Sequence, residues 1–172
     1  KLNSKQILIR RGKKGESLTT LDEIKRNVSP NELLITNGKS PLSLAGIMGG
    51  LDSAVSEQTK TILIESAYFD APTIRKGAKS LGMSTDASKR FERGADPNAS
   101  ESAFWRVIKL IEELSIGDWV PGIVDPYPKK LIGTQISLSR EKLDSLSGVK
   151  IKSDFVHDIL NKIGCNVNNK SE

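Results

Sequence analysis

Three short stretches between residues 46 and 97 carry the groups that could recognise or transform a small molecule. They are a glycine turn at 46–53, an apolar run that ends in Glu65, and a polar segment that opens Thr85-Asp86-Ala87-Ser88. Glycine lets a ligand come close to main-chain amides, a carboxylate accepts hydrogen bonds, and a helix start offers N–H groups without intrahelical partners. These are the parts of a small-molecule pocket.

The glycine turn admits three interpretations. Its residues Gly49-Gly50-Leu51-Asp52-Ser53 resemble the Ser-Gly-Gly-x-Asp-Ser loop with which ATP pyrophosphatases hold pyrophosphate. Met48 replaces the first hydroxyl of that loop, and residues 54–60 leave no room for the helix that a phosphate-binding loop opens. The other two interpretations are a tight turn between buried strands and a glycine wall along which substrate atoms approach backbone N–H groups.

Glu65 follows the apolar residues of a strand predicted at 61–68, where an unpaired ionised carboxylate would be costly. It therefore needs a partner or must line a cavity, and considered alone an ion pair with Arg or Lys is the favoured interpretation. Thr85 or Asp86 is predicted to cap a helix, with Ser88 in its first turn. The single His157 is distant in sequence, so no Ser-His-Asp triad and no metal site are predicted.

Composition restricts the class of protein and of partner. The chain has 172 residues, a net charge of +5 and a pI near 9.3, which favours an anionic partner, RNA ahead of a membrane. Aromatic residues make up only 5%, too few for a stacking platform. There is no apolar run of about 20 residues and no signal peptide. The single Cys165 excludes an internal disulfide and suits a reducing cytosol, so a cytoplasmic protein is expected.

The hydrophobic pattern predicts an α+β fold in which a sheet-rich core is followed by helices. Strands are predicted at 6–11, 17–21, 25–28, 32–36, 42–48, 61–68 and 135–138. Helices are predicted at 72–82, 85–94, 98–114 and 140–147, and after a cap at Ser153. The core is predicted to contain Ile35, Leu44, Ile47, Ile62, Ile64, Phe69, Leu81, Phe91, Phe104 and Ile111.

The order and identity of the residues in these motifs indicate a protein family more specifically than the chemistry of the single residues does. In order along the chain they read Ala45-Gly46-Ile47-Met48-Gly49-Gly50, Leu63-Ile64-Glu65-Ser66-Ala67-Tyr68-Phe69, Arg75, Leu81-Gly82, and Thr85-Asp86-Ala87-Ser88-x-Arg90-Phe91-Glu92-Arg93-Gly94-x-Asp96-Pro97. This series resembles the B3/B4 region of the bacterial phenylalanyl-tRNA synthetase β chain. Leu138-Ser139-Arg140-x-Lys142-Leu143 and Ile159-Leu160-x-x-Ile163-Gly164-Cys165 resemble the start of its B5 domain.

The resemblance implies an internal fragment of that β chain. Residues 1–117 would form an N-terminally truncated B3/B4 editing-type domain, 118–133 a proline-rich linker, and 134–172 a partial, small, helical B5 domain. In this family the B3/B4 module hydrolyses tyrosine wrongly attached to tRNA(Phe). The reaction is attack of water on an ester carbonyl, driven by positioning of the water by the pocket and the terminal ribose of the tRNA.

The resemblance also reverses the interpretation of Glu65. A pocket that accepts tyrosine and rejects phenylalanine needs a buried polar partner for the phenol hydroxyl, because phenylalanine leaves that partner unpaired. Glu65 occupies the family position that recognises this hydroxyl. Gly46 and Gly49 match the glycine wall of the pocket, and Thr85 and Ala87 match its other wall.

The family also implies what this chain lacks. Its editing His lies upstream of Lys1, so no catalytic residue is assigned here, and the fragment is expected to edit poorly or not at all and not to aminoacylate. ATP and Mg²⁺ belong to the parent enzyme, with no cofactor expected in the fragment. The implied partners are tRNA(Phe) and the synthetase α subunit, with which the chain would form a heterotetramer. No membrane partner is expected. Two alternatives remain: a non-catalytic structural or tRNA-docking module of the same synthetase, and an ATP-pyrophosphatase-like domain.

Overall fold

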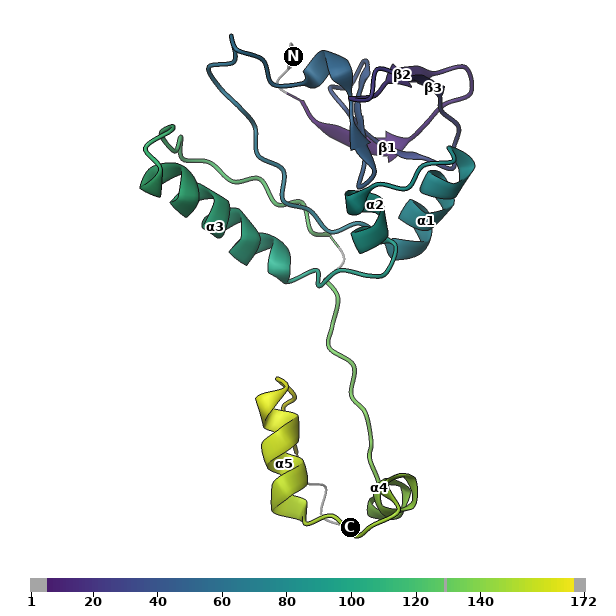
Figure 1. Ribbon diagram of the computed structural model, residues 1–172, viewed down its shortest axis with the longest axis vertical. Helices are drawn as coiled ribbons and strands as arrows, with labels where there is room; N and C mark the ends of the chain where they lie inside the picture. Colours follow the sequence, from purple (N-terminus) through teal and green to yellow (C-terminus); the bar gives the residue numbers. More distant parts are fainter. Residues whose placement is uncertain (1–5, 129, 169–172) are drawn as a thin grey trace. The chain divides into compact units, whose positions relative to one another are not determined.

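The computed structural model describes residues 6–128 and 130–168. Contacts divide the chain into two compact units, residues 1–125 and 126–172. Strands and helices both occur in the first unit, which confirms the predicted α+β class (Figure 1). No helix in the described ranges has the length and apolar character that a membrane span requires.

The described part of the first unit contains a four-stranded antiparallel sheet and a two-stranded hairpin. The sheet has the order β1 (Leu8–Arg11), β4 (Leu33–Thr36), β5 (Pro41–Leu44) and β6 (Met48–Gly49). The hairpin pairs β2 (Ser17–Thr19) with β3 (Lys25–Asn27), and a bridge from Thr20 to Gly50 joins it to the sheet. These strands confirm the predictions at 6–11, 17–21, 25–28 and 32–36.

Glycine shapes the connection between β5 and β6. The sequence predicts one strand at 42–48, but the chain turns at residues 45–47 and returns as β6. Gly46 has φ +66° in this turn, a conformation that costs residues with a Cβ about 1 kcal/mol or more. The region around Gly46 is therefore a tight hairpin turn, followed by the three-residue 3-10 helix η1 (Leu51–Ser53).

Three helices follow in the first unit. Helix α1 (Ala71–Ser80) begins after Asp70, whose carboxylate accepts a hydrogen bond from the Thr73 N–H. Helix α2 spans Asp86–Phe91 and α3 spans Ala99–Glu113. All three confirm the predicted helices. The side chains of Asp70 and Thr85 cap α1 and α2, whereas α3 follows Asn98 without a side-chain cap hydrogen bond.

The core lies between the sheet and α1. Its buried apolar residues, among those described, are Leu18, Val28, Leu34, Ile35, Leu44, Ala45, Ile47, Phe69, Ile74 and Ala78. The prediction is confirmed for Ile35, Leu44, Ile47 and Phe69. The predicted core residues that are only half-buried are Ile64, Leu81, Phe91, Phe104 and Ile111. The prediction for Ile62 is wrong, because 55% of its surface is exposed.

The strand predicted at 61–68 is also wrong. These residues belong to no ladder and follow a path without regular secondary structure, and a hydrogen bond of 2.7 Å joins Ser66 Oγ to the Ser100 carbonyl oxygen at the start of α3 (Figure 1). A strand needs a neighbour that accepts and donates its backbone hydrogen bonds. The segment finds none in the described chain, although its side chains are typical of a strand.

The second unit contains two described helices. Helix α4 (Arg140–Ser147) is capped by the Ser139 hydroxyl and ends at Gly148 with φ +72°. Helix α5 (Ser153–Lys162) begins at Ser153 with Lys152 as its N-cap, so the predicted cap was one residue off. The strand predicted at 135–138 does not form, and no described residue of this unit is fully buried. With little core to pack against, a four-residue strand has no partner that would stabilise it.

Candidate functional site

The turn around Gly46 is packed against aromatic residues of the core. A Cβ built on Gly46 would lie 2.9 Å from Phe69 Cδ2, 3.0 Å from Ile74 Cδ1 and 3.2 Å from Phe91 Cδ2. The two phenylalanine rings meet edge to face with centroids 5.1 Å apart. Glycine is thus required at position 46 both by its backbone conformation and by the close approach of these side chains.

The start of α2 is attached directly to this turn. Thr85 Oγ1 donates a hydrogen bond of 2.7 Å to the carbonyl oxygen of Ile47, which is 38 positions away in sequence. The same hydroxyl accepts from the Ser88 N–H at 3.0 Å and caps the helix. Two predicted pocket residues, Gly46 and Thr85, are therefore brought together, and the exposed Ala87 lies in the first turn of the attached helix.

Gly49 faces a different neighbour. It lies in β6 opposite Ser43, and its carbonyl oxygen accepts a hydrogen bond from the Leu21 N–H at 3.0 Å. A Cβ at Gly49 would lie 3.1 Å from Leu21 Cδ1. The neighbours of Gly49 thus come from the β2–β3 hairpin, whereas those of Gly46 come from α1, α2 and Phe69.

Glu65 lies in the irregular segment between η1 and α1 and is an exposed residue. The protein atoms that surround its carboxyl group nevertheless raise its pKa through desolvation. Within the described ranges it forms no hydrogen bond or ion pair, in particular none to the four other predicted residues. The expectation that Glu65 ends a buried strand is wrong, because its strand does not form.

The ATP-pyrophosphatase interpretation gains no support from the turn. Ser53 Oγ lies 2.8 Å from the Leu42 carbonyl oxygen and 3.0 Å from that of Gly50, so its hydroxyl is already used within the protein. The short η1 is followed by an irregular segment, whereas a phosphate loop opens an α-helix. In the described part of the chain, no three His, Cys, Asp or Glu side chains converge as metal ligands would.

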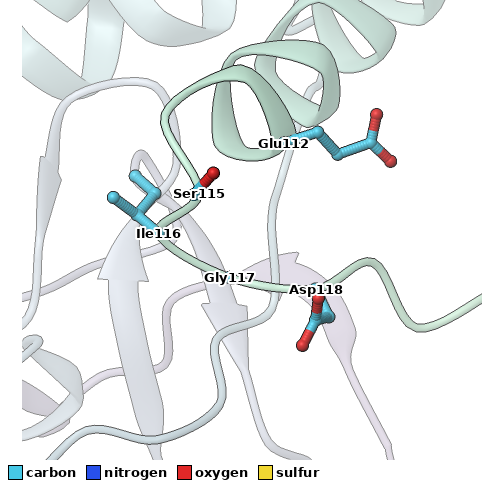
Figure 2. A pocket seen from close by; sticks show the side chains of 5 residues that line it. All are labelled: Glu112, Ser115, Ile116, Gly117 and Asp118. Carbon is cyan, nitrogen blue, oxygen red and sulfur yellow. The ribbon is translucent and has the colours of Figure 1, made fainter.

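Two surface hollows lie elsewhere. One, of about 490 Å³, is at the end of α3 and is lined by Glu112 and residues 115–118. Figure 2 shows the side chains of Glu112, Ile116 and Asp118 pointing away from one another, so this hollow offers no convergent polar groups. The other, of about 150 Å³, lies between α4 and α5. Neither is lined by the predicted pocket residues.

Sequence reasoning placed Ser88 in the first turn of a helix and Arg75 in the motif series, but it did not predict how these two residues organise the candidate site. Ser88 is only 1% exposed, and its side chain completes a reciprocal capping box with Thr85. Arg75 donates a hydrogen bond of 2.6 Å to the Glu92 carbonyl oxygen and so ties α1 to the end of α2. The Thr-x-x-Ser spacing is a capping-box signal that could have indicated Ser88; nothing local indicates the partner of Arg75.

Fold and site define an α+β domain in which a glycine turn is fixed against the start of a short helix. The chain belongs to the B3/4 domain family, whose model matches residues 1–116. Phenylalanine–tRNA ligase beta subunits are among its relatives. That of Syntrophus aciditrophicus is 43% identical over 98% of this chain, that of Halalkalibacterium halodurans 38% over 95%, and that of Thermotoga maritima 37% over 100%. These matches confirm the resemblance drawn from the motifs.

The chain spans about a fifth of the length of these relatives: 21%, 20% and 22% of the three proteins in the same order. The domain boundaries at 117 and 133 and the assignment of 134–172 to a B5 domain stay predictions. So do the roles of the five pocket residues.

Proposed function

We propose that this chain forms part of an editing site that hydrolyses tyrosine from mischarged tRNA(Phe) within a phenylalanine–tRNA ligase. The observation that carries the proposal is the hydrogen bond from Thr85 to Ile47, because it joins the predicted glycine wall to the helix that bears Ala87. The family and the relatives support the same conclusion.

Recognition in this proposal depends on the phenol hydroxyl. The Glu65 carboxyl group accepts a hydrogen bond from tyrosine, and phenylalanine would leave it desolvated without a partner, at a cost of about 1–3 kcal/mol. Glu65 is free for this role because no other group in the described chain pairs with it. Its raised pKa indicates a carboxyl group that protein atoms already desolvate in part.

Hydrolysis then follows from positioning. Water adds to the ester carbonyl carbon, and the C–O bond to the terminal ribose of the tRNA breaks. The ribose oxygen takes the electrons of that bond and a proton from the attacking water, which gives free tyrosine and a ribose hydroxyl. No side chain of this chain is assigned as nucleophile, so the pocket contributes by holding the ester and the water in a reactive geometry. Gly46 and Gly49 would bring main-chain groups close to the bound amino acid.

The proposal includes the setting of the reaction. The relatives are beta subunits, so we propose an α subunit as the partner in a heterotetramer, tRNA(Phe) as the substrate carrier, and the cytoplasm as the compartment. ATP and Mg²⁺ would serve aminoacylation at a site outside this chain. The net charge of +5 is consistent with an RNA partner.

The test is a Tyr-tRNA(Phe) hydrolysis assay with the full-length β subunit that contains this sequence, assembled with its α subunit. Glu65→Ala is expected to lower the hydrolysis rate about 10- to 100-fold, the equivalent of the hydrogen bond it removes. Ala87→Trp should block the pocket mouth. Glu57→Ala is the matched control, an exposed glutamate in the same irregular segment. Hydrolysis at the wild-type rate in Glu65→Ala and in Ala87→Trp contradicts the proposal.

One observation favours the docking alternative. Glu65 is exposed and belongs to an irregular segment, as expected if this region contributes surface rather than a pocket. In that case Glu65→Ala and Ala87→Trp leave hydrolysis unchanged, and substitution of basic residues weakens tRNA binding in a salt-dependent way. Measuring tRNA affinity at two salt concentrations beside the hydrolysis assay separates the two functions.

A further inference from the structure

Ser88 is a buried polar residue. It is the buried residue of α2, 1% exposed, on a six-residue helix whose other positions face solvent or are half-buried. Its hydroxyl accepts a hydrogen bond from the Thr85 N–H at 2.9 Å and donates to the Thr85 carbonyl oxygen at 3.0 Å. Buried polar groups that are satisfied in this way fix local geometry, because each lost bond leaves a desolvated group without a partner.

Thr85 transmits this geometry to the glycine turn. A threonine hydroxyl has one proton, and here that proton lies between Thr85 Oγ1 and the Ile47 carbonyl oxygen, 2.7 Å apart. The oxygen also accepts the Ser88 N–H. The hydroxyl is therefore used on both sides by the protein, and its proton is not available to a substrate.

The other end of α2 is attached to the same turn. Phe91, the last residue of the helix, packs on Phe69 and approaches Gly46 closely enough that a Cβ there would lie 3.2 Å from its ring. The Arg75 hydrogen bond to the Glu92 carbonyl oxygen holds this end to α1 as well. Ala87 is thus carried on a helix that is fixed at both ends relative to the turn.

We propose that Thr85 and Ser88 are positioning residues that form a clamp between α2 and the 45–47 turn and thereby set the width of the editing pocket. This inference rests on the proposed editing function and changes the role of Thr85 from a wall that contacts substrate to a support for that wall. The specificity it controls is the ratio of tyrosine to phenylalanine hydrolysis. A pocket that opens when the clamp is lost holds the phenol hydroxyl less accurately.

The experiment compares kcat/KM for hydrolysis of Tyr-tRNA(Phe) and Phe-tRNA(Phe) by the full-length β subunit assembled with its α subunit. Thr85→Val and Ser88→Ala are expected to lower the Tyr/Phe ratio about tenfold, mostly through kcat for tyrosine. Thr85→Ser keeps the hydroxyl and should restore most of the ratio lost in Thr85→Val. Amide hydrogen exchange of α2 should accelerate about tenfold in Thr85→Val and much less in Thr85→Ser.

Two controls separate a clamp from general destabilisation. Ser84→Ala removes an exposed hydroxyl beside the clamp, and Ile108→Val removes one buried methyl group from α3. Both should leave the Tyr/Phe ratio unchanged, the second despite its lower stability. An unchanged ratio in Thr85→Val and Ser88→Ala, while Glu65→Ala still lowers the rate of Tyr-tRNA(Phe) hydrolysis, overturns the clamp alone. Unchanged hydrolysis in Glu65→Ala overturns the editing function on which the clamp depends.

Discussion

Two five-residue segments of nearly the same composition have opposite environments in this protein. Glu32-Leu33-Leu34-Ile35-Thr36 contains the interior strand β4 and the residue before it, whereas Thr61-Ile62-Leu63-Ile64-Glu65 forms no regular structure. Both contain one glutamate, one threonine and three Leu or Ile residues. The first contributes Leu34, which is fully buried, and the second exposes 66% of Leu63. Hydrophobicity and β propensity therefore do not decide which segment becomes a strand.

The difference lies in the backbone partners. Strand β4 pairs with β1 on one edge and with β5 on the other, and β5 is delivered by the short Asn37-Gly38 turn. The segment 61–65 has no neighbouring strand in the described chain. The two glutamates differ in the same way. The buried Glu32 carboxylate accepts hydrogen bonds from the Ser29 N–H at 2.6 Å and from the Ser80 hydroxyl, whereas the Glu65 carboxylate has no hydrogen-bond partner in the described chain.

The largest difference in stability between the two segments is expected when their central leucines, Leu34 and Leu63, are replaced. Leu34→Ala should lower the free energy of unfolding by about 3 kcal/mol, because it removes a completely buried side chain and leaves a cavity. Leu63→Ala, the same change at the same place in the other segment, should cost less than about 0.5 kcal/mol. Urea unfolding of both variants measures the difference. Equal losses would show that 61–65 is packed as firmly as β4.

The two terminal glutamates should differ by a smaller amount. Glu32→Ala removes a buried carboxylate that accepts hydrogen bonds from the Ser29 N–H and the Ser80 hydroxyl, so we expect a loss of about 1–3 kcal/mol. Glu65→Ala removes a carboxylate that has no hydrogen-bond or ion-pair partner in the described chain and should change the stability by less than about 0.5 kcal/mol. The same unfolding measurement applies. A large loss in Glu65→Ala would indicate a structural ion pair and weaken its assignment to substrate.

The third prediction is that Glu16 and Glu65 contribute to stability with opposite dependence on pH. A hydrogen bond from Arg10 at 2.6 Å lowers the pKa of Glu16, so its contribution to stability is present above the ordinary value of 4.5 and is lost as pH falls through the lowered pKa. Desolvation raises the pKa of Glu65, so its ionisation costs stability as pH rises from 4.5 through the raised pKa.

Unfolding curves between about pH 3 and about pH 7 test this difference. Glu16→Gln should flatten the loss of stability on the acid side, and Glu65→Gln should increase stability relative to the wild type at the upper end of the range. Carbon NMR titration of the two carboxyl groups gives the pKa order directly. A pKa for Glu65 at or below that of Glu16 would contradict the expectation.

The smallest effect is expected in the rate at which trypsin cleaves segments of the chain that open locally. Trypsin should cleave after Lys60, in the irregular segment, well before it cleaves after Lys25 in β3, because cleavage requires a chain that opens locally. Ser66→Ala removes the exposed hydrogen bond to Ser100 and should accelerate cleavage at Lys60 about twofold. Ser102→Ala, an exposed serine on α3, is the matched control. Earlier cleavage at Lys25 would show that the hairpin is the weaker region.

Several features could be predicted because they depend only on neighbours in the sequence. Asn37-Gly38 specifies the turn between β4 and β5, Thr85 caps α2, and Gly148 ends α4 in the left-handed conformation. The collinear motifs from residue 45 to residue 97 were sufficient to indicate the family. Short-range hydrogen bonds and steric limits on φ fix these features wherever the segment is placed.

The tertiary structure alone decided which apolar segment is buried and which polar groups are paired. Glu32 and Glu65 have similar apolar neighbours in sequence, but the partners of Glu32 include Ser80, 48 positions away. The bond from Thr85 to Ile47 likewise joins residues 38 positions apart and cannot be read from either segment. Burial and pairing arise when distant parts of the chain meet, so the sequence determined the local conformation and the family, and the packing determined the hydrogen-bond partners of groups such as Glu32 and Thr85.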